Sequence, residues 1–173
     1  DWLGVKYSVF CNSGSSANLL LFLSLIHSGK LTNKKVIVPA VSWVTTVSPA
    51  MQLGLDPILC DCDEEDLGLN VDDFENLCKK YRPSAVMLVH VLGHSNKMKE
   101  IIRICNQYKV LMLEDTCEAY GSSIDGKKLG TFGLASTHSF FYGHAMSTIE
   151  GGIVSTNDQE LYNIMISIRS HGW

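Results

Sequence analysis

The sequence lacks any apolar run close to the roughly 18 residues that a helix needs to cross a bilayer, and it lacks an excess of positive charge. Its formal net charge is −4, so it has no basic surface of the kind that attracts nucleic acid or anionic lipid. We therefore expect neither nucleic acid nor a membrane as a partner. The 173 residues, 46% of them hydrophobic, suffice for one domain with a sizeable core.

Two further absences concern paired cysteines and the common nucleotide-binding loops. The six cysteines include no CxxC pair and several lie in apolar runs, so we expect reduced thiols in a cytoplasmic protein. Cys60-x-Cys62 would share one strand face, while Gly93 and a strand end interrupt the His90/His94 pair; we expect no metal at either. GxxxxGK[ST] and GxGxxG do not occur, which excludes a nucleotide P-loop.

Two periodicities alternate along most of the chain. Short apolar runs predict strands at 8–11, 36–40, 57–61, 85–91, 110–113, 136–142 and 153–156. Helical spacing predicts helices at 17–27, 45–53, 97–108 and 158–169, and a further helix that Asn70 or Asp72 caps and that runs to residue 80. The Gly- and Lys-rich segment 121–133 is predicted to be a loop. This alternation favours an α/β fold, a mostly parallel sheet with helices on both faces.

Polar residues follow several of the predicted strands. In open α/β sheets, ligands bind beyond the carboxyl ends of the strands, and Asn12–Ser16, Asp115 and His144 fall at such positions. The small residues Gly14, Ser15 and Ser16 at a helix start leave backbone N–H groups able to face a phosphate. An ordinary serine-capped helix explains the same residues.

Three side chains could serve a flat, ring-containing cofactor. Asp115 follows a buried strand and could hold a pyridine nitrogen in its protonated form, although a carboxylate there could equally cap a helix. Trp43 could stack on a ring or simply pack in the core. His144 lies in a loop between two strands, and histidine transfers protons near neutral pH; most loop histidines have no such role.

Taken together and in order, these segments resemble the DegT/DnrJ/EryC1/StrS family of sugar aminotransferases. The resemblance covers essentially the whole chain and rests on these segments: 12–17 (NSGSSA), 39–43 (PAVSW), 114–115 (ED), 139–140 (SF), 147–152 (STIEGG) and 169–172 (RSHG). It implies the fold-type-I architecture of pyridoxal phosphate enzymes, with residues 1–173 as a partial large, cofactor-binding domain. In that architecture Gly14, Ser15, Ser16 and Ser139 would hold the phosphate, Trp43 would stack on the ring, and Asp115 would pair with the ring nitrogen.

One departure from the family pattern is chemically important. The family's aminotransferases carry a lysine at the position of His144, and this sequence has no lysine after Lys128. Histidine cannot bond covalently to pyridoxal phosphate but can move protons. The change resembles a branch of the family that removes the C-3 hydroxyl of nucleotide-linked 4-keto-6-deoxy sugars. Glu118, where the aminotransferases usually carry Gln, resembles the same branch and would lie near the ring oxygen.

The resemblance to this branch implies a PLP/PMP-dependent 3-dehydratase that binds its cofactor non-covalently. Its partners would be a nucleotide-linked keto sugar, glutamate to regenerate pyridoxamine phosphate, and a second copy of the chain. Both chain ends look cut, predicting a fragment that lacks the small C-terminal domain. Leu134 departs from the pattern of the family, and Ala145 departs from that of the dehydratase branch. A transaminase and a non-catalytic binding protein remain alternatives, and Cys117 also matches a relative that binds an iron–sulfur cluster.

Overall fold

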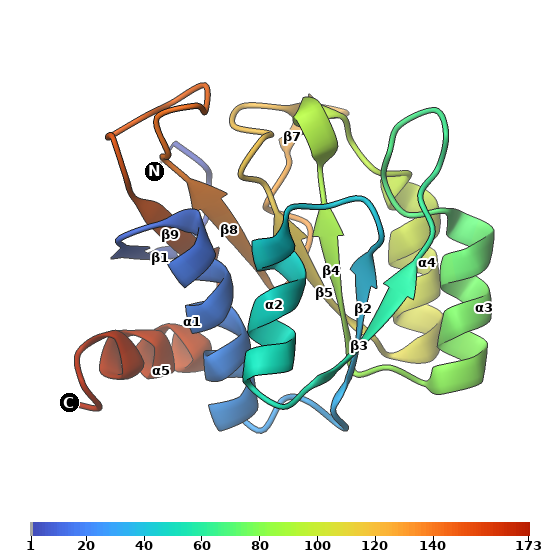
Figure 1. Ribbon diagram of the computed structural model, residues 1–173, viewed down its shortest axis with the longest axis horizontal. Helices are drawn as coiled ribbons and strands as arrows, with labels where there is room; N and C mark the ends of the chain where they lie inside the picture. The colour runs from blue at the N-terminus through green and yellow to red at the C-terminus, as the bar shows by residue number, and fades with distance from the viewer. Residues whose placement is uncertain (1) are drawn as a thin grey trace.

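The computed structural model describes residues 2–173, which form a central sheet with helices on either side (Figure 1). The strands are β1 (Tyr7–Cys11), β2 (Lys35–Pro39), β3 (Asp56–Cys60), β4 (Ala85–Val89), β5 (Leu111–Asp115), β6 (Ser123–Ile124), β7 (Lys127–Lys128), β8 (Ala135–Ser139) and β9 (Gly152–Thr156). The helices are α1 (Gly14–His27), α2 (Val44–Gln52), α3 (Val71–Tyr81), the 3₁₀ turn η1 (Val91–Gly93), α4 (Met98–Tyr108) and α5 (Gln159–Arg169).

The sheet has seven strands in the order β1-β9-β8-β5-β4-β2-β3. Strands β2, β3, β4, β5 and β8 pair in parallel, while β9 runs antiparallel to both β8 and β1. All strands of this sheet except β9 therefore point the same way, and their carboxyl ends meet at one edge. The mostly parallel α/β sheet predicted from the sequence is confirmed.

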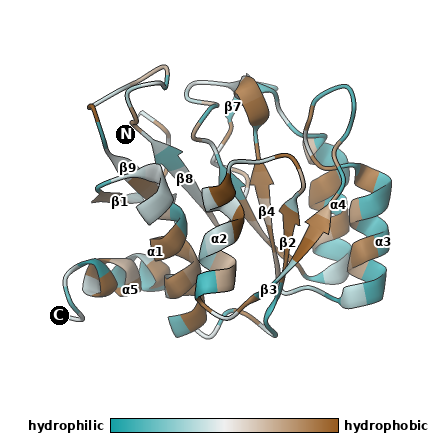
Figure 2. Cartoon of the chain, viewed as in Figure 1, coloured by the Kyte–Doolittle hydropathy of each residue, from teal (hydrophilic) through white to brown (hydrophobic). Residues whose placement is uncertain are grey.

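Successive residues of the central strands pack against different helices. Val36 and Val38 belong to the core beside α1, α2 and α5, whereas Ile37 between them packs with α3 and α4. The strands β4 and β5 alternate in the same way, because side chains along a strand point to opposite faces. Apolar colour fills β2 and β4, while α3 and α4 are two-sided (Figure 2). Burial on both faces explains why these strands are continuous apolar runs.

Three helices are capped at their N-terminus by a side-chain hydrogen bond. Ser13 accepts a hydrogen bond from Ser16 N at the start of α1, Asn70 from Asp73 N at α3, and Asp158 from the backbone N–H three residues on at α5. These bonds satisfy N–H groups that have no partner within the helix. For α3 the sequence left Asn70 and Asp72 open as caps, and the structure selects Asn70. None of the helices in residues 2–173 is both long enough and apolar enough to span a membrane.

The structure differs from the predicted elements mainly at strand ends. The strand predicted at 110–113 continues through Asp115 as β5, because Glu114 and Asp115 pair with β4 and β8. The strand predicted to reach Tyr142 ends at Ser139, after which the chain turns, with His144 N donating to Phe141 O. The predicted loop 121–133 contains the small antiparallel hairpin β6–β7.

A buried carboxylate, Glu114, holds the loop that leads into β8. Its oxygens accept hydrogen bonds from the backbone N–H groups of Gly130, Phe132 and Gly133 at 2.7–2.8 Å. His90 Nε2 lies 3.2 Å from Glu114 Oε2, and both side chains are fully buried. Burial alone would raise the pKa of the Glu114 carboxyl, but His90 and the backbone donors lower it below its usual value. Glu114 is therefore a structural anion.

The network continues from His90 into the neighbouring loops. Asn96 lies against His90 Nδ1, donates to Val89 O at 2.8 Å and accepts from Leu69 N at 2.9 Å. His90 is therefore held in the interior, whereas His94 is exposed. Among residues 2–173, no three His, Cys, Asp or Glu side chains are grouped as metal ligands would be.

Replacing Glu114 by Gln places an amide nitrogen against backbone N–H donors. We expect Glu114→Gln to lower the free energy of unfolding at pH 7 by about 2–4 kcal/mol. Because the folded-state pKa of Glu114 is depressed, its stabilisation exists above the unfolded-state pKa and is lost as the pH falls through the folded-state value. The difference from wild type should shrink on acidification, measured by urea unfolding of the full chain at several pH values.

The matched control is Glu64→Gln, at an exposed carboxylate, which should change stability by less than about 0.5 kcal/mol. A difference for Glu114→Gln that stays constant or widens at acid pH would contradict the assignment of Glu114 as a structural anion.

Candidate active site

A cavity of about 570 Å³ opens at the edge of the sheet where the carboxyl ends of the strands meet. Its walls come from the segments that follow β1, β2, β4, β5 and β8. The lining residues are Ser13, Gly14, Ser15, Val41, Ser42, Trp43, Thr45, Thr46, Val89, Val91, Asp115, Cys117, Glu118, Ser139, Phe141, Gly143, His144 and Glu150. A volume of this size suits a small-molecule ligand.

Asp115 is the buried charged group of this cavity, with 5% of its surface exposed. Its Oδ2 accepts hydrogen bonds from Asn18 Nδ2 at 2.9 Å and Thr46 Oγ1 at 3.1 Å. Its Oδ1 accepts one from Cys117 N at 3.1 Å. Glu114 and Asp115 are neighbours on β5 and point to opposite faces, which separates the structural carboxylate from the carboxylate at the cavity.

Asn18 and Thr46 were missed by the sequence analysis. Asn18 lies on α1 and is 1% exposed, and Thr46 lies on α2 and is also 1% exposed. The one sequence signal was the isolated amide of Asn18 in the apolar stretch that begins at Ala17, since a buried polar side chain needs hydrogen-bond partners. Thr46 gave no comparable signal.

The start of α1 packs very closely against the ends of β8 and β9. A Cβ atom on Gly14 would lie 2.5 Å from Ser139 Cβ, and one on Gly152 would meet the carbonyl of Ser13. Only glycine allows these approaches. They bring the N-terminal turn of α1 and the Ser139 side chain to the same wall of the cavity.

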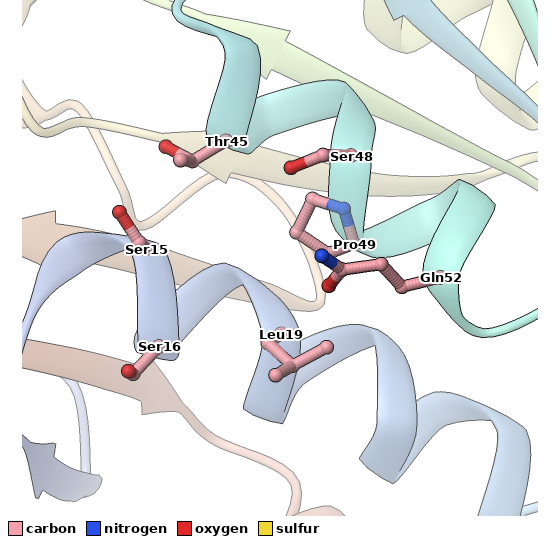
Figure 3. A pocket seen from close by; sticks show the side chains of 7 residues that line it. All are labelled: Ser15, Ser16, Leu19, Thr45, Ser48, Pro49 and Gln52. Carbon is pink, nitrogen blue, oxygen red and sulfur yellow. The ribbon is translucent and has the colours of Figure 1, made fainter.

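The two predicted phosphate-binding serines of α1 lie differently. Ser15 lines the cavity, whereas the Ser16 hydroxyl accepts a hydrogen bond from Ser13 Oγ at 3.2 Å and is absent from the lining. Ser16 borders a smaller hollow of about 150 Å³ between α1 and α2. Figure 3 shows Ser15 and Thr45, which line both spaces, facing the gap between the two helices.

Trp43 lies at the cavity and not in the core. It immediately precedes α2, and 74% of its surface is exposed. A large indole left exposed beside a cavity offers an apolar face to a flat ligand. Simple core packing, which the sequence left open as an alternative, does not describe this residue.

Glu118 joins the cavity to the turn that follows β4. Its Oε2 accepts a hydrogen bond from Leu92 N at 2.7 Å. Leu92 has φ 52° and is followed by Gly93 at φ 85°, a backbone arrangement that costs free energy for a residue other than glycine. The Glu118 carboxylate therefore holds this turn in place while it lines the cavity.

His144 is half-buried and lines the same cavity as Asp115. It belongs to the loop between β8 and β9, where its ring lies edge-on to Phe141 at a centroid distance of 6.0 Å. The cavity lining includes no lysine among residues 2–173. Of the predicted site residues, all but Ser16 thus meet at one cavity.

Cys117 lies between the start of α1 and Asp115. Its Sγ would be 3.2 Å from a Cβ on Gly14. Burial, and then the neighbouring Asp115 carboxylate, raises the pKa of the Cys117 thiol well above its usual value. The thiol is therefore neutral near pH 7, whereas a thiolate is the form that binds metals.

Comparison with known proteins identifies the relatives of this chain. The GDP-4-keto-6-deoxy-D-mannose 3-dehydratase of Yersinia pseudotuberculosis is 41% identical over 176 residues, covering 100% of this chain and 44% of the relative. The Escherichia coli GDP-4-keto-6-deoxy-D-mannose-3-dehydratase, solved with bound hydrated PLP, is 39% identical with a TM-score of 0.93, covering 99% of this chain and 44% of that one.

A further structure of a GDP-4-keto-6-deoxymannose-3-dehydratase contains a trapped PLP–glutamate geminal diamine. It is 38% identical, with a TM-score of 0.93 over 99% of this chain and 45% of that one. The chain thus spans less than half the length of these relatives. A model of one protein family also matches the chain over residues 1–173. The chain belongs to the DegT/DnrJ/EryC1/StrS aminotransferase family.

Proposed function

We propose that this protein catalyses the PLP/PMP-dependent removal of the C-3 hydroxyl from a nucleotide-linked 4-keto-6-deoxyhexose, with glutamate restoring pyridoxamine phosphate. The observation that carries the proposal is that His144 lines one cavity with Asp115. The sequence resemblance implies that His144 takes the position of the family's lysine. The relatives named as 3-dehydratases support the reaction class. Residues 1–173 would form the cofactor-binding part of the larger protein.

The residues around the cavity fit a pyridoxal phosphate in three respects. Asp115 presents a carboxylate to a pyridine nitrogen, and Trp43 presents an exposed indole to the ring. The N-terminal turn of α1 at Gly14 and Ser15, with Ser139 beside it, provides the hydroxyl groups and positive helix end that a phosphate requires. Glu118, already hydrogen-bonded to Leu92 N, would lie near the ring oxygen. Ser16 would act through its hydrogen bonds to Ser13, the residue that caps this turn.

Three residues of this chain would have separate roles in the reaction. Bound pyridoxamine phosphate would supply an amine for the sugar ketone and a ring able to take up electrons. During dehydration, His144 would accept the proton that leaves the cofactor's C4′ carbon. Asp115 would keep the ring nitrogen protonated, and Trp43 would hold the ring in the orientation that favours this proton transfer. Without a lysine at position 144, the chain would hold the cofactor non-covalently.

A second copy of the chain is proposed to complete the site. Large apolar side chains near the cavity are exposed, among them Tyr142 at 74% and Ile149 at 80%. Both belong to the loop that carries His144. Exposed apolar groups gathered around a cavity are typical of surfaces that another chain covers. A homodimer in which each loop is covered by the partner subunit accounts for them.

A nucleotide-sugar aminotransferase is the second candidate, and it is favoured by the family to which the chain belongs. It would require an amine from another source, because the sequence has no lysine after Lys128. A non-catalytic binding protein is the third candidate, and it would retain cofactor without turnover. The reaction product separates all three.

The test of the proposed reaction uses the full chain with pyridoxal phosphate, glutamate and GDP-4-keto-6-deoxymannose. We expect a sugar product that has lost one oxygen atom and gained no nitrogen, with one 2-oxoglutarate formed per turnover, because glutamate supplies the two reducing electrons. Mass spectrometry of the nucleotide sugar measures this. A product that gains an amino group would indicate a transaminase, and unchanged substrate with bound cofactor would indicate a binding protein.

Exchanging His144 for lysine tests the role of this residue. We expect His144→Lys to abolish dehydration, a loss of at least about 100-fold, and to bond covalently to pyridoxal phosphate. After borohydride reduction, intact-mass measurement of the full chain should show added cofactor in the variant but none in wild type. His144→Asn, which can neither transfer the proton nor bond to the cofactor, is the matched control and should lose dehydration without a mass increase. Unchanged dehydration in either variant would remove His144 from the mechanism.

A further inference from the structure

We propose that Asn18 and Thr46 are positioning residues that bind one oxygen of Asp115 and leave the other, Oδ1, free to accept a single N–H donor from the ligand. This inference rests on the proposed function, because the donor would be the protonated ring nitrogen of the cofactor. It assigns a selective role to Asn18, which lies behind the cavity wall, and to Thr46, which lines it.

The acceptor capacity of the carboxylate supports the choice of oxygen. Each carboxylate oxygen has about two lone-pair positions. Asn18 Nδ2 and Thr46 Oγ1 both donate to Oδ2, which uses its capacity. Cys117 N donates to Oδ1, which leaves about one position there. A ligand N–H that enters the cavity would therefore meet Oδ1 as the acceptor still available.

Asn18 is held so that it can only donate toward Asp115. Its Oδ1 accepts a hydrogen bond from Thr137 Oγ1 at 2.7 Å, and its Nδ2 donates to Thr45 O at 3.0 Å as well as to Asp115. Rotating the amide by half a turn would put oxygen against two acceptors. The two acceptors, Thr45 O and Asp115 Oδ2, therefore fix the orientation of the amide, and the Thr137 hydroxyl donates to its oxygen from β8. Asn18 joins α1, the start of α2, β5 and β8 through one side chain.

All three hydrogen bonds to the Asp115 side chain are donated by its neighbours and accepted by its oxygens. The acceptor position that remains on Oδ1 therefore suits an N–H donor from the ligand. The buried amide of Asn18 is costly without partners, so a merely space-filling role would be served better by an apolar side chain.

The test measures the affinity of the full chain for two ligands: pyridoxal phosphate and its 1-deaza analogue, in which carbon replaces the ring nitrogen. Wild type should bind pyridoxal phosphate more tightly. We expect Asn18→Leu to weaken pyridoxal phosphate binding about tenfold and to change the affinity for the analogue less than about twofold. Fluorescence quenching during titration measures both, and neither measurement depends on turnover.

A second pair of variants applies if Asn18→Leu fails to fold. Thr46→Val keeps the side-chain shape but removes the hydroxyl, and should lower the preference for pyridoxal phosphate. Thr46→Ser keeps the hydroxyl and should retain that preference. Equal weakening of both ligands by Asn18→Leu or Thr46→Val would mean that the residues act only on the fold, and would overturn the inference.

The outcome for Asp115→Asn separates this inference from the proposed function. If wild type does not prefer pyridoxal phosphate, or if Asp115→Asn leaves the preference unchanged, the proposed cofactor role of Asp115 fails. If Asp115→Asn abolishes the preference while Asn18→Leu and Thr46→Val retain it, the cofactor assignment stands and the positioning role is wrong.

Discussion

The arrangement of the site depends on a buried carboxylate that three different parts of the chain hold in place. Asp115 ends the central strand β5, and its oxygens accept from α1, α2 and the backbone that follows β5. A carboxyl group at 5% exposure is stable only with hydrogen-bond partners of this kind. The helices that pack on one face of the sheet must therefore dock in one register, and that register also brings Ser15 and Trp43 to the cavity.

Glu114 has a complementary role on the opposite side of the same strand. Its charge is balanced within the protein by three backbone donors and His90, and it shapes the loop that leads into β8. β8 in turn ends at Ser139, beside the start of α1. Of these two neighbouring carboxylates, Glu114 thus fixes the loop and Asp115 faces the ligand cavity.

Much of the fold and the location of the site could be predicted from the sequence. Continuous apolar runs such as 85–89 indicate strands buried on both faces, and polar residues that follow such strands gather at one edge of the sheet. Asn18 and Thr46 could not be predicted as partners of Asp115, because they lie 97 and 69 residues away in the chain. Such contacts follow from helix docking and leave no local pattern. The sequence also does not show that Ser15 lines the cavity while Ser16 hydrogen-bonds to Ser13, because this depends on how α1 packs.

We propose that the Asp115 carboxylate binds a protonated pyridine nitrogen in this cavity. Nitrogen-15 NMR of labelled pyridoxal phosphate bound to the full chain tests this directly, because the chemical shift of the ring nitrogen reports its protonation. We expect a protonated ring nitrogen in the wild-type complex at neutral pH. An unprotonated ring nitrogen in the wild-type complex would contradict it.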